Sequence, residues 1–335
     1  MGTNVYVTGI AGFLGSRLAE ALVGAGYGVR GCDNLMGGDR ANVPMGVHLD
    51  VVDCADVAAM KVATAGADIL YHCAATAYEG LSVFSPAFVC QNVFQASVAT
   101  FTAAIDNGVQ RIILCSSMAR YGAGTPPFRE NTPALPVDPY GVAKLAAEDV
   151  LRALSTLHGF DFTIAVPHNI YGPHQRYDDP YRNVAAIMAN RMLQGLPAII
   201  YGDGRQRRCF SYVDDAVVCL LRMATSTAVV GEVVNIGPDD EFIEVRELAA
   251  LLSDLTGCRE PPIFHAPRHG EVHAANCSAD KARRLLGFEP RVPLRAGLLK
   301  LVEHIRARGP RAFRYDLPIE IDSPALPSTW RHRLI

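Results

Sequence analysis

Hydrophobic and polar positions alternate in blocks up to about residue 165 of the chain. Short apolar runs predict buried β-strands at Asn4–Thr8, Val29–Cys32, Val47–Leu49, Ile69–Cys73, Ile112–Cys115 and Phe162–Val166. Segments with helical periodicity separate them, at Ser16–Val23, Asp56–Ala65, Phe84–Asn107 and Tyr140–His158. Such alternation predicts right-handed β-α-β units and a doubly wound parallel sheet of the α/β class, covered by helices on both faces.

The pattern changes after Pro167, where loops rich in Pro, Tyr and Arg separate shorter helices. These helices are predicted at Arg182–Gln194, Asp214–Ala224 and Val245–Thr256. Val233–Ile236 reads as an extra strand that returns to the main sheet. We therefore expect a nucleotide-binding domain over residues 1–166, a smaller substrate-binding lobe over 167–309, and a packed C-terminal extension over 310–335.

Composition narrows the class of protein. The 335 residues carry a net charge of −3, so a nucleic-acid or anionic-membrane surface is not expected. Neither a secretion signal nor an apolar run long enough to span a bilayer is evident. The nine cysteines are scattered without metal-ligand spacing, which predicts buried thiols, no metal site and a cytoplasmic location.

A glycine turn follows the first predicted strand. Gly9, Gly12 and Gly15 stand at three-residue spacing directly before the first helix. Glycines allow a pyrophosphate to approach the backbone, and the helix N-terminus offers free N–H groups to it. Asp33 ends the second strand, where a carboxylate can hold the ribose hydroxyls of adenosine and repel a 2′-phosphate. The expected cofactor is NAD rather than NADP.

A second group of residues can carry acid–base chemistry. Tyr140 and Lys144 are four residues apart and share one face of a predicted helix. A nearby ammonium favours the phenolate, so Tyr140 is the expected general base. Ser117, where the fifth strand ends, can share a proton with it and hold a substrate oxygen.

Together these motifs resemble the extended short-chain dehydrogenase/reductase family of the nucleotide-sugar type, with UDP-glucose 4-epimerases as the nearest members. The resemblance extends from Asn4 to about Leu299. It implies a Rossmann-type fold and Ser117, Tyr140 and Lys144 as the catalytic set. It also implies that the cofactor is held by Gly9, Gly12, Phe13, Leu14, Gly15, Asp33, Asn34, Asp50, Val51, Cys73, Ala74, Ala75, Asn92, Tyr140 and Lys144.

The same resemblance implies a UDP-sugar site built mainly from the second half of the chain. Tyr201 would stack on the uracil, Arg208 and Arg268 would bind the diphosphate, and Glu271 would bind a ribose. The implied substrate residues are Ser117, Met118, Asn169, Arg176, Asn183, Val184, Ile199, Tyr201, Arg208, Arg268 and Glu271.

Departures from the family's other patterns favour a particular reaction. Sugar 4,6-dehydratases follow the active-site hydroxyl with an Asp-Glu pair, and family decarboxylases carry a glutamate there; this chain has Met118 and Ala119. Arg120 replaces a small or β-branched residue. His72 and His168 read as buried neutral histidines rather than catalysts. The reaction that the resemblance to UDP-glucose 4-epimerases implies is epimerisation at C4 of a UDP-sugar through a transient 4-keto sugar.

The identity of the sugar remains open between two readings. Arg176 falls where uronate epimerases of the family place an arginine near the substrate carboxylate, which makes UDP-glucuronate a competitor of UDP-glucose and UDP-galactose. The other reading is a salt bridge from Arg176 to Asp178 or Asp179. Two further alternatives are a nucleotide-sugar 4-ketoreductase and a non-catalytic NAD-sensing protein.

The apolar pattern of the helix after Pro86 predicts that two copies of the chain associate. Its apolar positions exceed the stripe needed to face one sheet, and they are Phe88, Val89, Phe94, Val98, Phe101 and Ile105. Members of the family often pair through the helices that follow strands four and five. We therefore expect a homodimer.

Overall fold

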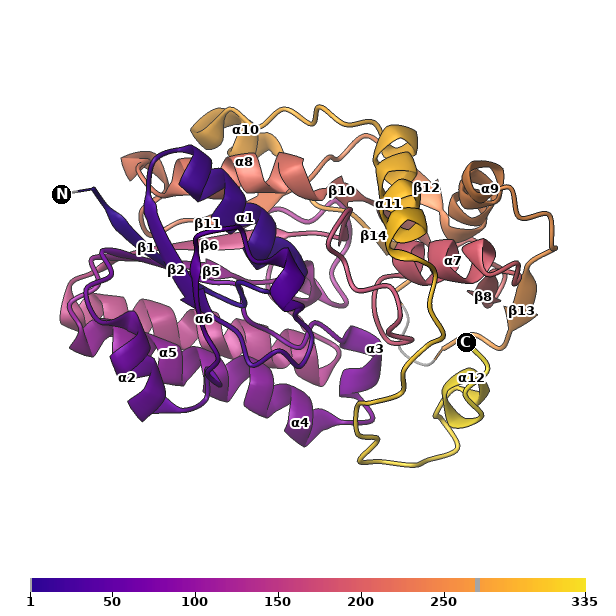
Figure 1. Cartoon of the computed structure of the whole chain (residues 1–335), viewed down its shortest axis with the longest axis horizontal. Helices are drawn as coiled ribbons and strands as arrows, with labels where there is room; N and C mark the ends of the chain where they lie inside the picture. Colours follow the sequence, from indigo (N-terminus) through magenta and orange to yellow (C-terminus); the bar gives the residue numbers. More distant parts are fainter. Residues whose placement is uncertain (1, 269–271) are drawn as a thin grey trace.

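A seven-stranded parallel sheet lies at the centre of the computed structural model, which describes residues 2–268 and 272–335 (Figure 1). Its strand order is β11-β6-β5-β4-β1-β2-β3, so the chain reverses direction across the sheet between β1 and β4. The strands are β1 Asn4–Thr8, β2 Gly28–Cys32, β3 His48–Asp50, β4 Ile69–His72, β5 Arg111–Cys115, β6 Asp161–Pro167 and β11 Val233–Ile236. The predicted doubly wound sheet is confirmed.

Helices cover both faces of this sheet, which explains why its strands are apolar throughout. One face carries α1 Phe13–Gly24, α8 Val213–Met223 and α10 Asp280–Leu286 (Figure 1). The other face carries α2 Val57–Thr64, α5 Ala96–Asp106 and α6 Pro139–His158. A buried hydrophobic cluster fills each interface between sheet and helices.

Helix α6 is fixed at both ends by local sequence. The Asp138 carboxylate accepts a hydrogen bond of 2.8 Å from the Gly141 amide, and Pro139 occupies the first helical position. Gly159 ends the helix at φ 72°, in the left-handed region. The first turns of α6, which carry Tyr140 and Lys144, therefore have a defined position.

The single helix predicted over Phe84–Asn107 is interrupted. The structure has α4 Pro86–Cys90, a π-helical turn η2 Gln91–Gln95 and then α5. Apolar periodicity does not distinguish a π turn from an α turn over so few residues. Such turns are frequent at functional sites, and this one carries Asn92.

The same stretch contradicts the expectation that no apolar run of the chain is long enough to span a bilayer. Pro86–Asp106 is long and apolar enough to cross a bilayer by length and composition, and half of its most apolar window is buried in the protein. It packs against α2 and α6. A core helix has the same properties, so this finding alone is weak evidence for a membrane segment.

The second half of the chain forms a lobe beside the carboxyl ends of the strands. Helices α7 Val184–Leu193, α9 Val245–Thr256 and α11 Leu294–Arg308 share one hydrophobic cluster. Its short strands are β7 Ile170–Tyr171, β8 Ile199–Tyr201, β9 Arg207–Cys209, β10 Ser211–Tyr212, β12 Phe242–Glu244, β13 Ile263–His265 and β14 Ala274–Ala275. The remaining helices are η1 Arg40–Asn42, α3 Glu79–Ser82, η3 Met118–Tyr121, η4 Thr227–Val229 and α12 Ser328–Arg331.

Residues 310–335 return across the molecule and end beside the lobe (Figure 1). Trp330 of α12 and Leu326 join a buried cluster with Tyr78, Phe84 and Tyr181. The Trp330 ring meets that of Tyr181 edge to face, with centroids 5.0 Å apart. The tail is therefore packed against both halves of the chain.

Candidate active site

A cavity of about 540 Å³ lies where the strands of the main sheet end and the second lobe begins. It brings together most residues that the sequence predicts for cofactor and substrate. They are Gly9, Gly12, Phe13, Leu14, Gly15, Asp33, Asn34, Cys73, Ala74, Ala75, Asn92, Ser117, Met118, Tyr140, Lys144, Asn169, Arg176, Asn183, Val184, Ile199, Tyr201, Arg208 and Arg268.

Two of the predicted residues that the structure describes do not line the cavity. Asp50 ends β3 and accepts a hydrogen bond from the Tyr6 hydroxyl, and Val51 is half exposed. The chain enters the cavity wall only afterwards, at Val52 and Asp53. β3 ends at Asp50, one residue later than the sequence predicts, so Asp50 and Val51 lie outside the lining. Glu271 lies outside the described residues.

The glycine turn needs glycines for close packing as well as for ligand approach. Gly9 has φ +70°, and a Cβ on Gly15 would lie 2.1 Å from the Gly9 carbonyl oxygen. No side chain caps the N-terminus of α1 at Gly12. The first amides of α1 therefore remain available to an anion in the cavity.

Asp33 is buried at the end of β2 with its carboxylate fixed by the backbone. It accepts hydrogen bonds from the Ala11 amide at 3.1 Å and the Leu35 amide at 2.8 Å. Burial raises its pKa, and the bonds from Leu35 and Ala11 oppose that effect. The open helix end and this carboxylate fit the pyrophosphate and ribose of NAD.

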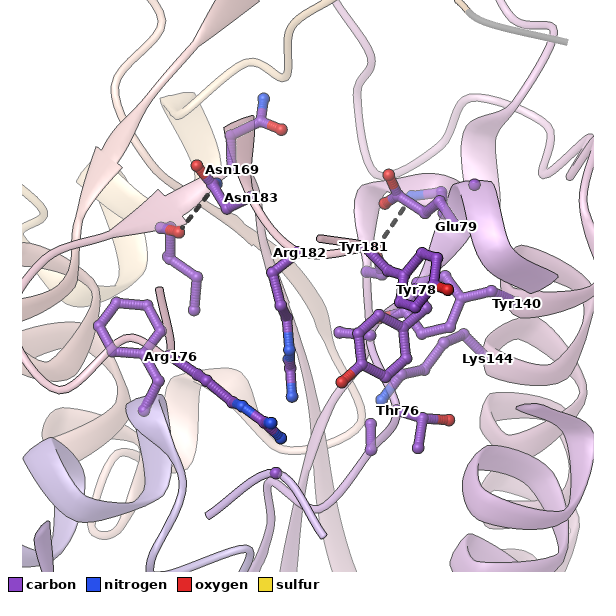
Figure 2. Close-up of a pocket in the computed structure, with 18 of the residues that line it drawn as sticks. Thr76, Tyr78, Glu79, Tyr140, Lys144, Asn169, Arg176, Tyr181, Arg182 and Asn183 are labelled. Atoms are coloured by element: carbon purple, nitrogen blue, oxygen red, sulfur yellow. Dashed lines mark hydrogen bonds between the residues drawn. The ribbon is translucent and has the colours of Figure 1, made fainter. Parts of the chain in front are cut away.

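Ser117, Tyr140 and Lys144 all line the cavity, and Figure 2 shows Tyr140 and Lys144 on the same side of it. The Ser117 hydroxyl lies near enough to the Tyr140 phenol to lower its pKa, and it accepts a hydrogen bond of 3.2 Å from the Ala119 amide. The Lys144 ammonium donates to the Cys115 carbonyl oxygen at 2.8 Å and lies 5.9 Å from the centre of the Tyr140 ring. A hydroxyl, a phenol and an ammonium in this order can bind a substrate oxygen and move its proton.

The expectation that Lys144 lowers the pKa of Tyr140 is not met in the protein alone. Burial, followed by the charge of Glu79, raises the pKa of Tyr140, while the Ser117 hydroxyl lowers it. Burial also lowers the pKa of Lys144. In the protein without ligands, these influences favour the protonated phenol.

Arg120, whose role the sequence leaves open, is part of a buried ionic group. Its Nε lies 3.0 Å from the carboxylate of Glu148, which is fully buried on α6. The same carboxylate accepts a hydrogen bond from Ser116 and pairs with Arg152 at 3.1 Å. Glu148 follows Lys144 by one helical turn, so this group ties the end of β5 to the helix that carries Tyr140.

The diphosphate residues predicted from sequence line the opposite part of the cavity. Arg268 lies with its guanidinium carbon 4.9 Å from the centre of the Tyr201 ring, and Arg208 donates to the Arg207 carbonyl oxygen at 2.9 Å. The Tyr201 hydroxyl lies 2.5 Å from Thr329 Oγ1 in the C-terminal tail. Two arginines beside an aromatic ring are suited to a nucleoside diphosphate.

Two predicted ligand residues also have structural partners. The Asn183 side-chain oxygen caps α7 by accepting from the Ala185 amide at 2.9 Å. The Asn169 side-chain nitrogen donates to the Cys209 carbonyl oxygen at 2.8 Å, and Asn169 has φ 43°. Both residues line the cavity, but their amides already hold the lobe together.

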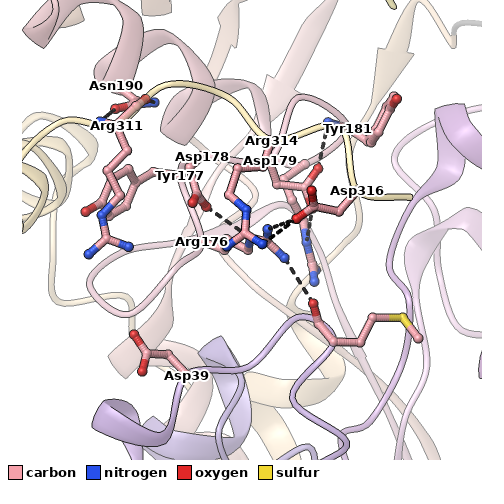
Figure 3. Close-up of polar contacts among 12 residues, drawn as sticks. Asp39, Arg176, Tyr177, Asp178, Asp179, Tyr181, Asn190, Arg311, Arg314 and Asp316 are labelled. Atoms are coloured by element: carbon pink, nitrogen blue, oxygen red, sulfur yellow. Dashed lines mark hydrogen bonds and ion pairs between the residues drawn. The ribbon is translucent and has the colours of Figure 1, made fainter. Parts of the chain in front are cut away.

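Arg176 is engaged on several sides (Figure 3). Its Nε donates to Asp178 at 3.0 Å, and its Nη1 donates to the Met36 carbonyl oxygen at 3.0 Å. Its Nη2 lies 3.6 Å from Asp316 of the tail. These contacts agree with the salt-bridge reading of Arg176, extended by a partner in the tail.

The sequence interpretation missed a group of charged and aromatic residues in the cavity wall. Glu79 and Tyr78 come from the turn after β4, Arg182 precedes α7, and Trp330 comes from the tail. Arg182 lies over the Tyr78 ring at 4.5 Å (Figure 2). Glu79, four residues after Ala75, was a charged residue near the predicted cofactor backbone and so a signal available in the sequence, whereas nothing local placed Trp330 here.

His72 and His168, which the sequence analysis predicts to be buried structural histidines, are both buried and hydrogen-bonded. His72 lies 2.9 Å from Thr8 Oγ1 and 3.0 Å from Ser97 Oγ. His168 Nε2 lies 2.9 Å from the Pro238 carbonyl oxygen. Within residues 2–268 and 272–335 no group of three His, Cys, Asp or Glu could hold a metal ion.

The fold and this cavity define a dinucleotide-dependent enzyme of the short-chain dehydrogenase type. The profile of the NAD dependent epimerase/dehydratase family matches residues 5–237. The chain belongs to this family, whose cofactor is NAD.

Curated relatives differ in substrate and reaction. A UDP-glucose 4-epimerase of Mycolicibacterium smegmatis is 34% identical over 316 residues, which cover 90% of this chain and 98% of the relative. A UDP-N-acetyl-alpha-D-glucosaminuronate decarboxylase of Bacillus cytotoxicus is 31% identical, with 91% and 98% covered. The structure of UDP-glucose 4-epimerase with UDP-glucose from Thermotoga maritima superposes with a TM-score of 0.86 at 33% identity, with 91% and 99% covered. The chain is therefore a nucleotide-sugar enzyme of this family.

Proposed function

We propose that the chain inverts the configuration at C4 of a UDP-hexose, with UDP-glucose and UDP-galactose as the favoured pair. The carrying observation is the Ser117–Tyr140–Lys144 group facing a cavity in which Met118 and Ala119 occupy the place of a dehydratase's acid and base. The relatives named as UDP-glucose 4-epimerases support this choice.

In the proposed reaction Tyr140 takes the proton of the sugar 4-hydroxyl, and Ser117 holds that oxygen by a hydrogen bond. NAD supplies hydride transfer to and from C4 when it is bound. Lys144, anchored on the Cys115 carbonyl, keeps a positive charge on the same side of the cavity. Arg208 and Arg268 would hold the diphosphate while the 4-keto sugar turns, so binding and chemistry act on separate parts of the ligand.

The contacts of Arg176 argue against a hexuronate as the substrate. A substrate carboxylate would have to compete with Asp178 and Asp316, which already lie 3.0 Å and 3.6 Å from its guanidinium. Two acidic neighbours near one arginine reduce its net positive charge toward a ligand. A neutral sugar needs no such cation.

The test compares turnover of UDP-glucose and UDP-glucuronate without added cofactor by the parent protein and by Arg176→Ala. We expect UDP-galactose as the product, and a loss that is small and equal for both sugars. Selective loss of UDP-glucuronate turnover would favour the uronate reading. Formation of a deoxysugar with release of NAD would favour the ketoreductase reading, and absence of any turnover would favour an NAD-sensing protein.

We also propose a homodimer in a reducing, cytoplasmic compartment. Phe88, Phe94, Val98 and Ile105 remain only partly buried on α4 to α5, and Leu157 of α6 is 78% exposed. An apolar face of this kind favours pairing of helices between two copies. Light scattering at micromolar concentration should give twice the chain mass.

The proposal of a reducing compartment rests on the cysteines. All nine are free thiols, including Cys73 and Cys115, whose sulfurs lie 3.6 Å apart.

A further inference from the structure

Glu79 is the acidic residue of the cavity wall that neither the fold nor the cofactor site requires. It begins the short helix α3, lines the cavity and presents an exposed side chain to it. Among the described residues no hydrogen bond or ion pair holds its carboxylate. A carboxylate left without a partner beside a reaction centre is available to a ligand.

The backbone that carries Glu79 is fixed by its neighbours. The preceding Tyr78 donates to Asp179 at 2.6 Å, and Ser82 donates to the Glu79 carbonyl oxygen at 2.7 Å. On the other side, a Cβ on Gly80 would lie 3.2 Å from the Trp330 ring and 3.5 Å from the Arg268 guanidinium. Packing therefore fixes the backbone position of Glu79, while its carboxylate has no hydrogen-bond or ion-pair partner among the described residues.

Glu79 lies between the two ends of the substrate site. On one side, α3 packs against α6, the helix that carries Tyr140, and Figure 2 shows Glu79 on the same side of the cavity as Tyr140. On the other side, the cavity wall around the carboxylate raises the pKa of Glu79 by desolvation, and the charges of Arg208 and Arg268 oppose that rise. A nucleotide sugar with its diphosphate on these arginines and its C4 oxygen at Tyr140 must place the hexose ring across this interval.

We propose that Glu79 contacts the sugar and determines specificity: its carboxylate accepts hydrogen bonds from hydroxyl groups of a neutral hexose and repels a hexuronate. This inference rests on the proposed function. A carboxylate is a strong acceptor for hydroxyl donors and places like charge against a sugar carboxylate. Burying two carboxylates together is unfavourable, so discrimination comes from repulsion as well as from attraction.

The experiment uses the full-length protein with two substitutions of Glu79 and one control. Glu79→Gln removes the charge and keeps an acceptor oxygen, and Glu79→Ala removes both. Glu289→Gln is the matched control, because Glu289 is exposed and does not line the cavity. Binding of UDP-glucose and of UDP-glucuronate is measured by calorimetry, and kcat/KM is measured for each sugar.

With Glu79→Ala we expect kcat/KM for UDP-glucose to fall about tenfold to a hundredfold, since a hydrogen bond to a charged group is lost. With Glu79→Gln we expect the ratio of UDP-glucuronate to UDP-glucose affinity to rise at least about tenfold. The control should match the parent.

Unchanged affinities and an unchanged ratio in both variants would overturn the proposal. Binding of UDP-glucose without epimerisation would count against the proposed function alone, because the binding ratio would still decide the role of Glu79. Failure of the parent protein to bind either nucleotide sugar would overturn both.

Discussion

Tyr140 is surrounded by charges of both signs. Glu79 and Asp138 raise its pKa, whereas Ser117 and Arg182 lower it, and burial is the largest influence. The phenol therefore stays protonated in the absence of ligands.

Tyr140→Phe should remove the proton acceptor and leave the fold intact, because the substitution removes one hydroxyl group and keeps the buried ring. Turnover should fall by about a hundredfold to ten-thousandfold. Tyr121→Phe is the matched control, since Tyr121 is a buried tyrosine that donates to Asn235 at 2.8 Å and does not line the cavity. Turnover of Tyr140→Phe within a few-fold of the parent, with NAD bound, would exclude Tyr140 as the base.

His72 should make stability depend on pH. Burial lowers its pKa to about 3, against about 6.5 in an unfolded chain. Between these values the unfolded chain binds the extra proton, so stability is full above about pH 6.5 and falls as pH decreases toward 3. The slope approaches about 1.4 kcal/mol per pH unit inside the window.

Denaturant unfolding at pH 7 and pH 5 measures this effect in the parent and in His72→Gln. The variant lacks the titrating ring, so its stability should change less between the two pH values. An equal change in both proteins would assign the pH dependence to other groups.

Among the elements, those that follow from burial could be predicted from the sequence. The apolar runs located each strand of the sheet, and the glycine turn and the Tyr140–Lys144 spacing located the two main parts of the site. Local periodicity could not show the π turn that carries Asn92, because the apolar face continues through it. It also missed α3, whose four residues, Glu79–Ser82, are too short to establish a period.

Contacts between distant segments could not be predicted for a different reason. Nothing near Arg176 in the sequence indicates Asp316, and nothing near Tyr201 indicates Thr329. These pairs depend on the path of the tail, which long-range packing decides. The identity of a side chain's partner therefore required the structure even where the side chain itself was predicted.

Asp33, directly after β2, should determine whether the protein binds NAD or NADP more tightly. The Asp33 carboxylate is fixed by the Ala11 and Leu35 amides and repels a 2′-phosphate. Asp33→Asn keeps an acceptor for one amide and removes the charge, so the ratio of NADP to NAD affinity should rise at least about tenfold. Calorimetry measures both ligands. Equal affinity of the parent for NADP and NAD would contradict the ribose assignment.

At the scale of the whole molecule, the tail connects the two halves of the chain. Glu320 accepts hydrogen bonds of 2.9 Å from the Ala87 and Phe88 amides at the start of α4. The Arg314 amide donates to the Asp178 carbonyl oxygen at 2.8 Å in the second lobe (Figure 3). The wall of the cavity therefore depends on residues that follow the last helix of the lobe.

Trp330→Ala should weaken both the fold and ligand binding. Loss of a buried aromatic ring costs about 3–5 kcal/mol, and the ring also forms cavity wall beside Gly80. We expect a lower unfolding midpoint and at least about tenfold weaker UDP-glucose binding by calorimetry. Arg314→Ala is the control, since its side chain forms an exposed pair with Asp316 at 2.7 Å, worth little. Parent-like binding by Trp330→Ala would separate the tail from the site.

Because Ile335 itself lines the cavity, the last residue of the chain is also part of its wall. An affinity tag or reporter fused directly after Ile335 would begin at the wall of the cavity. β1 lies toward the opposite end of the molecule (Figure 1). Fusions placed ahead of β1, or immobilisation through that end, keep the added residues away from the cavity wall at Ile335.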